Sequence, residues 1–277
     1  DNASVWVSSG WATNHATATF TKTLVSGKSG TDRIAWREWS MDTYGPIVLA
    51  AEYGPKVSRD NMAGQVHLSE DYGQTWRVIF DLADVDKSTG VEAHLHGVKY
   101  DPWWDAIWVS NGDFVQNAAN WVSFDHGATW TRLAFVHQVT NMIPLPSCVL
   151  FVTDTGSVNG IYRLPRTHPA NLTVELALTQ DAGSGITMLG TQIFQLRSRP
   201  GSPVLMSADA GGVSGPARLF ATYDGYNFRE VWTDNQSYVN HGLRTMVGPT
   251  ITGKYHGRLD RVTNYATDSV VITLAPA

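Results

Sequence analysis

One octapeptide pattern occurs twice in the chain and strongly limits the folds that the chain can adopt. The sequence reads SEDYGQTW at Ser69–Trp76 and SFDHGATW at Ser123–Trp130, so Ser-x-Asp-x-Gly-x-Thr-Trp recurs after 54 residues. Each copy lies between two strand-like runs, and a weaker copy with Asp224, Gly225 and Phe228 follows 99 residues after the second. Repetition at this spacing is typical of an array of similar structural units.

The segments between the octapeptides repeat at a similar interval. Short apolar runs bounded by Gly, Pro, Asn and Asp dominate the chain, and only the stretch near Leu82–Asp86 suggests a helical turn. Two further strand-like runs precede each octapeptide, as in HLHGVKYDPWWDAIWVSNGD, so a unit of roughly 50 residues contains four strands. Four strands per unit predict an all-β fold, a β-propeller of four-stranded blades.

The predicted propeller forms one domain, residues 1–277, because no linker-like stretch divides the chain. We expect five blades, with six as the alternative. A pair of strands within residues 242–277 would complete an N-terminal half-blade, and closing the ring with strands from both termini would remove an exposed sheet edge.

Composition narrows the range of partners. The net charge of −5 leaves no basic surplus to neutralise nucleic-acid phosphates. No run approaches the ~18 apolar residues of a membrane span, so no membrane insertion is expected. The single cysteine, Cys148, lies in the apolar run PSCVLFVTD and is interpreted as a buried hydrophobic residue. The 11 Trp, 10 Tyr and 9 Phe fit a large core and also fit stacking on sugar rings.

The composition of the octapeptide is that of a tight turn. Its Asp can accept backbone N–H bonds with help from the Ser or Thr hydroxyl. Its Gly permits a backbone conformation that strains other residues, and its Trp can pack between neighbouring blades. We therefore assign structural roles to Ser69, Asp71, Gly73, Trp76, Ser123, Asp125, Gly127 and Trp130.

This octapeptide resembles the Asp-box, or BNR repeat, of sialidase-like propellers. The resemblance implies that the turns lie on the face opposite the active site, so that Asp71 and Asp125 are not catalytic. Over roughly residues 45–165 the chain is also similar to a group of bacterial and phage-encoded BNR-repeat proteins. This chain and the proteins of that group share a series of motifs in the same order. The series is Asp-box, His-x-His-Gly-Val, Tyr-Asp-Pro, Gly-Asp, Asp-box, Gln, Thr-Asp and Asn-x-Ile-Tyr-Arg.

The sialidase catalytic pattern is incomplete in this sequence. Sialidases bind the sugar carboxylate with three arginines, one of them in a Phe/Tyr-Arg-Ile-Pro motif, and use a Tyr–Glu pair with an Asp. The nearest run here, DRIAWRE, has Arg33 and Ile34 without the Pro. The remaining candidates, Arg37, Arg197 and Arg244, form no assignable triad, so sialidase activity itself is not expected.

Strand topology places the candidate site at the other face, where second strands end and first strands begin. The polar residues at these positions are Glu52, Asp113, Asp154, Asp209, Arg37, His94, His96, His137, Gln138 and Arg244. His94 and His96 are two positions apart in a strand, so their rings point to one side. With carboxylates they could bind a metal, or they could donate protons or bind sugar hydroxyls. We predict no metal and no cofactor.

Three functions remain open from the sequence. The first is an extracellular or virion-surface glycan-recognition module, such as a phage-tail or cell-surface adhesin, that binds a poly- or oligosaccharide. The second is a glycoside hydrolase or polysaccharide lyase that uses Glu52 and Asp113 as a carboxylate pair and His96 as a proton shuttle. The third is a structural propeller that docks neighbouring domains or subunits through an apolar patch around Trp103–Trp104 on the face opposite the site.

Overall fold

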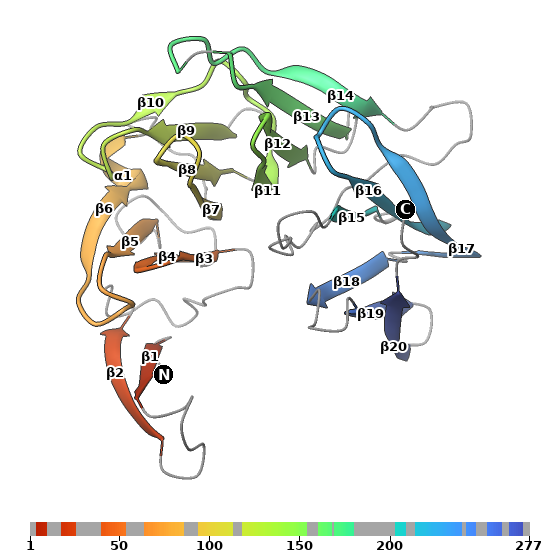
Figure 1. Ribbon diagram of the computed structural model, residues 1–277, viewed down its shortest axis with the longest axis horizontal. Coiled ribbons are helices and arrows are strands. Elements are labelled where there is room, and N and C mark those ends of the chain that lie inside the picture. The colour runs from red at the N-terminus through yellow and green to blue at the C-terminus, as the bar shows by residue number, and fades with distance from the viewer. Residues whose placement is uncertain are drawn as a thin grey trace. The chain divides into compact units, whose positions relative to one another are not determined.

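The structure is a computed structural model in which nearly all regular elements are β-strands (Figure 1). It describes residues 4–9, 18–25, 40–53, 64–85, 94–112, 118–153, 160–167, 169–179, 203–208, 214–239, 242–247, 254–261 and 266–273. Within these ranges the one helix is α1 (Leu82–Val85), at the position that the sequence predicts. No helix in the described part of the chain has the length and apolar character needed to cross a membrane.

In the described ranges, three complete four-stranded antiparallel sheets follow one another along the chain. The first contains β3 (Met41–Tyr44), β4 (Ile47–Ala51), β5 (Gln65–Ser69) and β6 (Arg77–Asp81). The second contains β7 (Leu95–Asp101), β8 (Ala106–Asn111), β9 (Ala119–Ser123) and β10 (Thr131–Arg132). The third contains β11 (Val139–Pro144), β12 (Cys148–Thr153), β13 (Gly160–Pro165) and β14 (Glu175–Thr179). In each sheet successive strands pair with one another, as the predicted blades require.

Smaller sheets precede and follow these three. The strands β1 (Ser4–Ser9) and β2 (Thr19–Val25) form a hairpin. Toward the C-terminus lie β15 (Val204–Ala208), β16 (Ser214–Thr222) and β17 (Arg229–Val239), and then β18 (Gly242–Val247), β19 (Lys254–Arg261) and β20 (Ala266–Thr273). The last group has three strands where the sequence suggested a pair, because β19 and β20 also pair with each other along their whole length. These sheets fit four to five blades, and closure of the ring by both termini stays a prediction.

The chain divides into two compact units, residues 1–136 and 137–277, each with a core of its own. In the first unit a core fills the space between two neighbouring sheets, with Leu49 and Leu68 on one side and Val98 and Val109 on the other. In the second unit Leu150, Val152 and Met206 belong to a comparable core. Since burying one such side chain stabilises a fold by about 1.5–3 kcal/mol, face-to-face packing of sheets is the main stabilising contact within each unit.

Cys148 belongs to the second core, as the sequence predicts. Its side chain is buried, and burial raises the pKa of the thiol to about 11. The thiol is therefore protonated at neutral pH and packs as a small apolar group.

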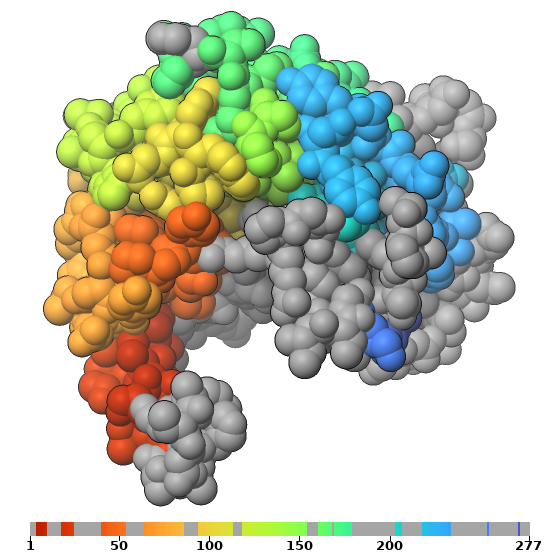
Figure 2. All heavy atoms as spheres, viewed as in Figure 1, coloured from red at the N-terminus to blue at the C-terminus, as the bar shows by residue number. Residues whose placement is uncertain are grey.

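Each octapeptide turn packs against the sheet that precedes it. The Trp130 indole N–H donates to the Ile79 carbonyl at 2.8 Å, and the Trp130 ring meets Phe80 edge-on. The Trp76 indole N–H lies 3.2 Å from the Thr23 hydroxyl in β2, and the atoms of the β1–β2 hairpin lie against this first complete sheet (Figure 2). Trp76 and Trp130 thus join neighbouring sheets, as their position before the outgoing strand suggests.

The glycine of the second octapeptide also lies against the preceding sheet. Gly127 has a φ of 90°, and a Cβ built there would lie 2.5 Å from the Ile79 Cβ. Any other residue at this position would therefore meet both backbone strain and a steric overlap.

Replacing Gly127 tests this packing. We expect Gly127→Ala to lower the free energy of unfolding by about 1–3 kcal/mol more than Gly45→Ala, because overpacking adds to the backbone cost that both changes share. Gly45 is a matched control, with a φ of 55° and no atom within 4 Å of the added Cβ. Urea denaturation of both variants measures the difference, and equal losses would contradict the packing argument.

Candidate functional site

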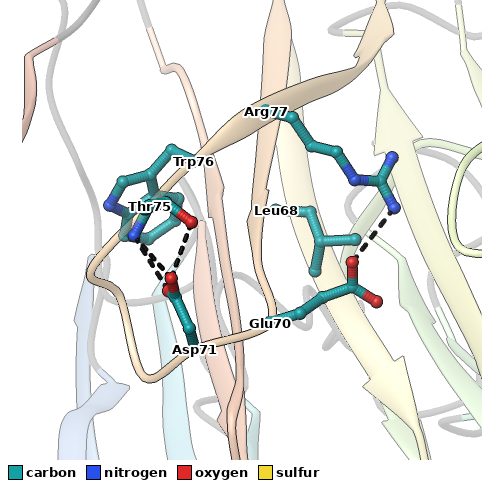
Figure 3. Close-up of a pocket in the computed structure, with 6 residues that line it drawn as sticks. All are labelled: Leu68, Glu70, Asp71, Thr75, Trp76 and Arg77. Carbon is teal, nitrogen blue, oxygen red and sulfur yellow. Dashed lines mark hydrogen bonds and ion pairs between the residues drawn. The ribbon is translucent and has the colours of Figure 1, made fainter.

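The polar atoms of the first octapeptide hydrogen-bond to one another across the turn (Figure 3). The Ser69 hydroxyl donates to Asp71 Oδ1 at 2.7 Å and accepts the Gly73 N–H at 2.8 Å. Asp71 Oδ1 accepts the Thr75 N–H at 2.8 Å, and Asp71 Oδ2 accepts the Thr75 hydroxyl at 2.6 Å. Both carboxylate oxygens are thus engaged within the turn, which leaves them poorly placed to act on a substrate.

The second octapeptide repeats these contacts. Ser123 donates to Asp125 at 2.8 Å, and the Thr129 N–H and hydroxyl donate to the same carboxylate at 2.8 and 2.6 Å. The hydrogen bonds from the two threonines are the main cause that lowers the pKa of Asp71 and of Asp125 to about 2. Both carboxylates are charged at neutral pH, and the geometry favours a structural role for them.

A hollow of about 200 Å³ lies beside the first octapeptide (Figure 3). It is lined by Leu68, Glu70, Asp71, Thr75, Trp76 and Arg77. Its volume is below the ~300–1,000 Å³ of typical ligand pockets. The size of this hollow therefore does not favour a ligand-binding site at the octapeptide end of the sheets.

At the other end of the first sheet, a carboxylate lies in a fully buried position. Glu52 follows β4, and its side chain is 0% exposed. Its Oε2 accepts the Gln65 N–H at 3.2 Å, and its Oε1 lies 3.5 Å from His67 Nε2. Burying a carboxylate costs free energy unless it has partners, so this position needs the imidazole and the backbone donor beside it.

The predicted histidine pair lies at the start of the second sheet. His94 Nε2 and His96 Nε2 are 2.9 Å apart, and both side chains are buried. Tyr53, the residue after Glu52, places its ring 4.4 Å from the His94 ring. At this distance one imidazole nitrogen can donate a hydrogen bond to the other. Two of these contacts involve residues that the prediction omitted: His67 lies beside Glu52, and Tyr53 lies beside the His94–His96 pair.

The omitted residues leave only weak signals in the sequence. Tyr53 lies in AAEYG directly after the predicted acid, and His67 lies in QVHLS between buried apolar neighbours. Residues on both faces of this strand are buried, so a histidine among them indicates a polar contact inside the fold. The pattern alone does not say which carboxylate that histidine meets.

His137 and Gln138 belong to the second compact unit, just before β11. The His137 ring stacks on Tyr162 at 4.9 Å, and burial lowers the pKa of His137. Gln138 is 8% exposed. These two residues are polar groups at the start of an innermost strand, as the sequence suggests.

The remaining candidates cannot be placed beside these groups. Arg37, Asp113, Asp154 and Asp209 lie outside the described residues, and Arg244 lies in β18 with only its backbone described. Among the residues that the structure describes, no group of three or more His, Cys, Asp or Glu side chains is arranged to hold a metal ion.

Comparisons with known proteins give the fold but no family. No protein-family model matches the sequence, and no curated protein sequence matches it. A chain of a solved nidogen/laminin complex is 8% identical with a TM-score of 0.53, over 90% of this chain and 83% of that one. YCF48 from Cyanidioschyzon merolae is 12% identical over 87% of this chain and 67% of its own, with a TM-score of 0.49.

A further similar structure is BamB from Moraxella catarrhalis, 11% identical over 88% of this chain and 67% of its own, with a TM-score of 0.42. The successive four-stranded antiparallel sheets described above give the chain a β-propeller-type fold. Identities this low show the fold alone.

Removing one octapeptide carboxylate tests its structural role. We expect Asp125→Asn to lower the urea midpoint near neutral pH, because an amide has one acceptor oxygen where the carboxylate has two. The pKa of Asp125 is about 2, below its ordinary 3.8, so its stabilisation is present above pH 3.8 and is lost as the pH falls through about 2. Asp125→Asn should remove this acid-dependent loss, measured by urea denaturation across the acid range.

The control is Asp84→Asn, which removes the same charge from an exposed position in α1. Equal effects of the two substitutions would show that the carboxylate of Asp125 has no special role in the turn.

Proposed function

We propose that this chain is an extracellular or virion-surface glycan-recognition propeller, and that it binds a saccharide at the end of its first unit opposite the octapeptide turns. Its octapeptides would be Asp-boxes of the sialidase-like type, with a structural role. The observation that carries the proposal is the group Glu52, Tyr53, His94 and His96, which gathers polar side chains and an aromatic ring where the end of β4 meets the start of β7.

The chemistry of this group suits a sugar. An aromatic ring offers an apolar face to the C–H groups of a pyranose, and Tyr53 is the half-buried member of the group. Carboxylate and imidazole groups accept and donate hydrogen bonds to hydroxyls, and Glu52 and the histidine pair provide both kinds. Because neighbouring groups already fix these side chains, little conformational entropy would be lost on binding.

A glycan-cleaving enzyme at the same site is the second candidate. The contact between Glu52 and His67 favours it, because a carboxylate beside an imidazole is a common arrangement for moving a proton. In this alternative Glu52 and Asp113 form the carboxylate pair of a glycoside hydrolase, or His96 moves a proton in a polysaccharide lyase. A propeller that only docks neighbouring domains or subunits is the third, and Trp103, which is 47% exposed, favours it.

One set of variants separates the three functions. We expect wild-type protein to bind members of a glycan array, and Glu52→Gln and His96→Ala to weaken that binding at least tenfold, or about 1.4 kcal/mol. Polysaccharide depolymerisation is assayed beside the array. Binding without products supports recognition, and products lost in both variants support the enzyme.

The control is Glu175→Gln, the same chemical change at an exposed residue of β14. Urea denaturation of each variant shows whether its fold is intact, and Glu52→Gln is nearly isosteric. No glycan signal from folded wild-type protein would contradict both the first and the second function and leave docking.

A further inference from the structure

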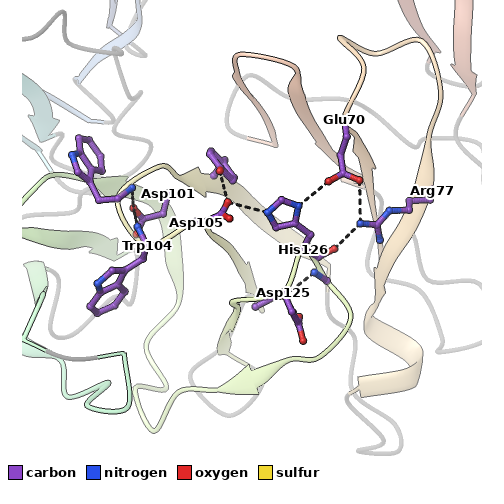
Figure 4. Close-up of polar contacts among 11 residues, drawn as sticks. Glu70, Arg77, Asp101, Trp104, Asp105, Asp125 and His126 are labelled. Atoms are coloured by element: carbon purple, nitrogen blue, oxygen red, sulfur yellow. Dashed lines mark hydrogen bonds and ion pairs between the residues drawn. The ribbon is translucent and has the colours of Figure 1, made fainter.

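Three turns of the first unit meet at one histidine, His126, at the octapeptide end of the sheets (Figure 4). His126 belongs to the second octapeptide, between β9 and β10. Its Nδ1 lies 2.7 Å from Glu70 Oε1, in the first octapeptide, and its Nε2 lies 2.9 Å from Asp105 Oδ1, in the β7–β8 turn. One imidazole therefore connects two sheets and three turns.

The two contacts define the protonation state of the ring. Ionised carboxylates only accept hydrogen bonds, so each ring nitrogen of His126 must carry a proton to bond to its partner. A neutral imidazole has one N–H and can satisfy only one of the two carboxylates. Both bonds together require the imidazolium form.

Other charged groups surround the ring. From β6, Arg77 Nη2 donates to the His126 carbonyl at 3.0 Å and lies 3.4 Å from Glu70 Oε2. From β7, the Tyr100 hydroxyl bonds to Asp105, and the Tyr100 N–H donates to Asp42 Oδ2 at 2.9 Å.

Asp125, beside His126 in sequence, is occupied within its own turn and stays charged across the neutral and mildly acidic range. The carboxylates of Glu70 and Asp105 are thus the groups that respond to the charge of His126.

We propose that His126 is a pH-dependent clamp, whose imidazolium fastens the second octapeptide turn to the first octapeptide turn and to the β7–β8 turn. When the ring loses a proton, one of the two carboxylate contacts is lost. Arg77 then still bonds to the His126 carbonyl, so the turns loosen without separating.

The direction of each pKa shift defines the pH range of the clamp. The hydrogen bond to Glu70, followed by that to Asp105, raises the pKa of His126 above its ordinary 6.5. The hydrogen bond to His126 lowers the pKa of Glu70 below 4.5. The Tyr100 hydroxyl, followed by His126, lowers the pKa of Asp105 below 3.8.

Stabilisation from His126 is complete below pH 6.5 and is lost as the pH rises through its raised pKa. Stabilisation from the carboxylates is complete above pH 4.5 and is lost as the pH falls through their lowered pKa values. The clamp is therefore strongest in mildly acidic solution, between pH 4.5 and 6.5.

Two exposed aromatic side chains lie on the turns that the clamp joins. The β7–β8 turn carries Trp103, and the second octapeptide carries Phe124, which are 47% and 37% exposed. Trp104 packs edge-on against Phe124 at 5.9 Å and links the same two turns through apolar contact. If the His126–Asp105 bond were lost, the contact between Trp104 and Phe124 would still link the two turns.

Titration by NMR tests the clamp directly. We expect the His126 ring, assigned by loss of its signals in His126→Asn, to titrate with a midpoint above 6.5 and to carry protons on both nitrogens below it. Glu70→Gln and Asp105→Asn should each lower that midpoint by about half to one pH unit, which is about a three- to tenfold loss of proton affinity. Asp84→Asn, the exposed control in α1, should leave it unchanged.

Backbone amide signals test whether the turns respond. In wild-type protein the amides of Glu70 and Asp105 should shift with the His126 midpoint, and this step should vanish in His126→Asn. Asn tolerates the left-handed backbone of position 126, where φ is 53°, so this variant keeps the turn and loses the titration. A midpoint at or below 6.5, or an amide step that persists in His126→Asn, would overturn the proposal.

Discussion

The packing of neighbouring sheets depends on a turn that is stiffened by its own side chains. In the second octapeptide the carboxylate of Asp125 accepts hydrogen bonds from Thr129, and the Ser123 hydroxyl accepts the Gly127 N–H. This network fixes the direction in which the following tryptophan leaves the turn. The indole of Trp130 can then reach the Ile79 carbonyl in another sheet. A local hydrogen-bond network thus becomes a contact between residues that are far apart in the sequence.

The sequence predicts the parts of the structure that have local causes. The turn geometry, the four-stranded units, the short helix at Leu82 and the buried Cys148 all follow from residue types at fixed spacings. The proximity of His94 and His96 also follows, because two positions along a strand face one side. These features need no knowledge of how distant segments meet.

The features that escaped prediction depend on distant segments. His67 meets Glu52 only because β4 and β5 pair in one register, and His126 meets Glu70 across 56 positions of sequence. At position 126 the octapeptide pattern allows any residue, so its histidine gave no signal. Arg37, Asp113, Asp154 and Asp209 lie outside the described residues, so the sequence remains the basis for including them in the site.

At the fourth position of the octapeptide, the side chains of the two full copies have different surroundings. Tyr72 and His126 occupy it with similar left-handed backbones, at φ values of 62° and 53°. Tyr72 is 65% exposed, whereas His126 binds two carboxylates. The shared turn chemistry therefore sets the backbone and leaves this side chain free to give each turn its own surface.

The weaker third copy has no residue at the fourth position of the octapeptide, between the Asp and the Gly, and it keeps the turn. Gly225 follows Asp224 directly, and its N–H donates to Thr222 at 2.9 Å, three residues away instead of four. Asp224 still accepts the Asn227 N–H, and a Cβ on Gly225 would still overlap the Cys148 sulfur of the preceding sheet. The turn and its packing therefore survive the loss of one residue. What disappears is the side chain that, in the second copy, connects the turn to its neighbours by charge.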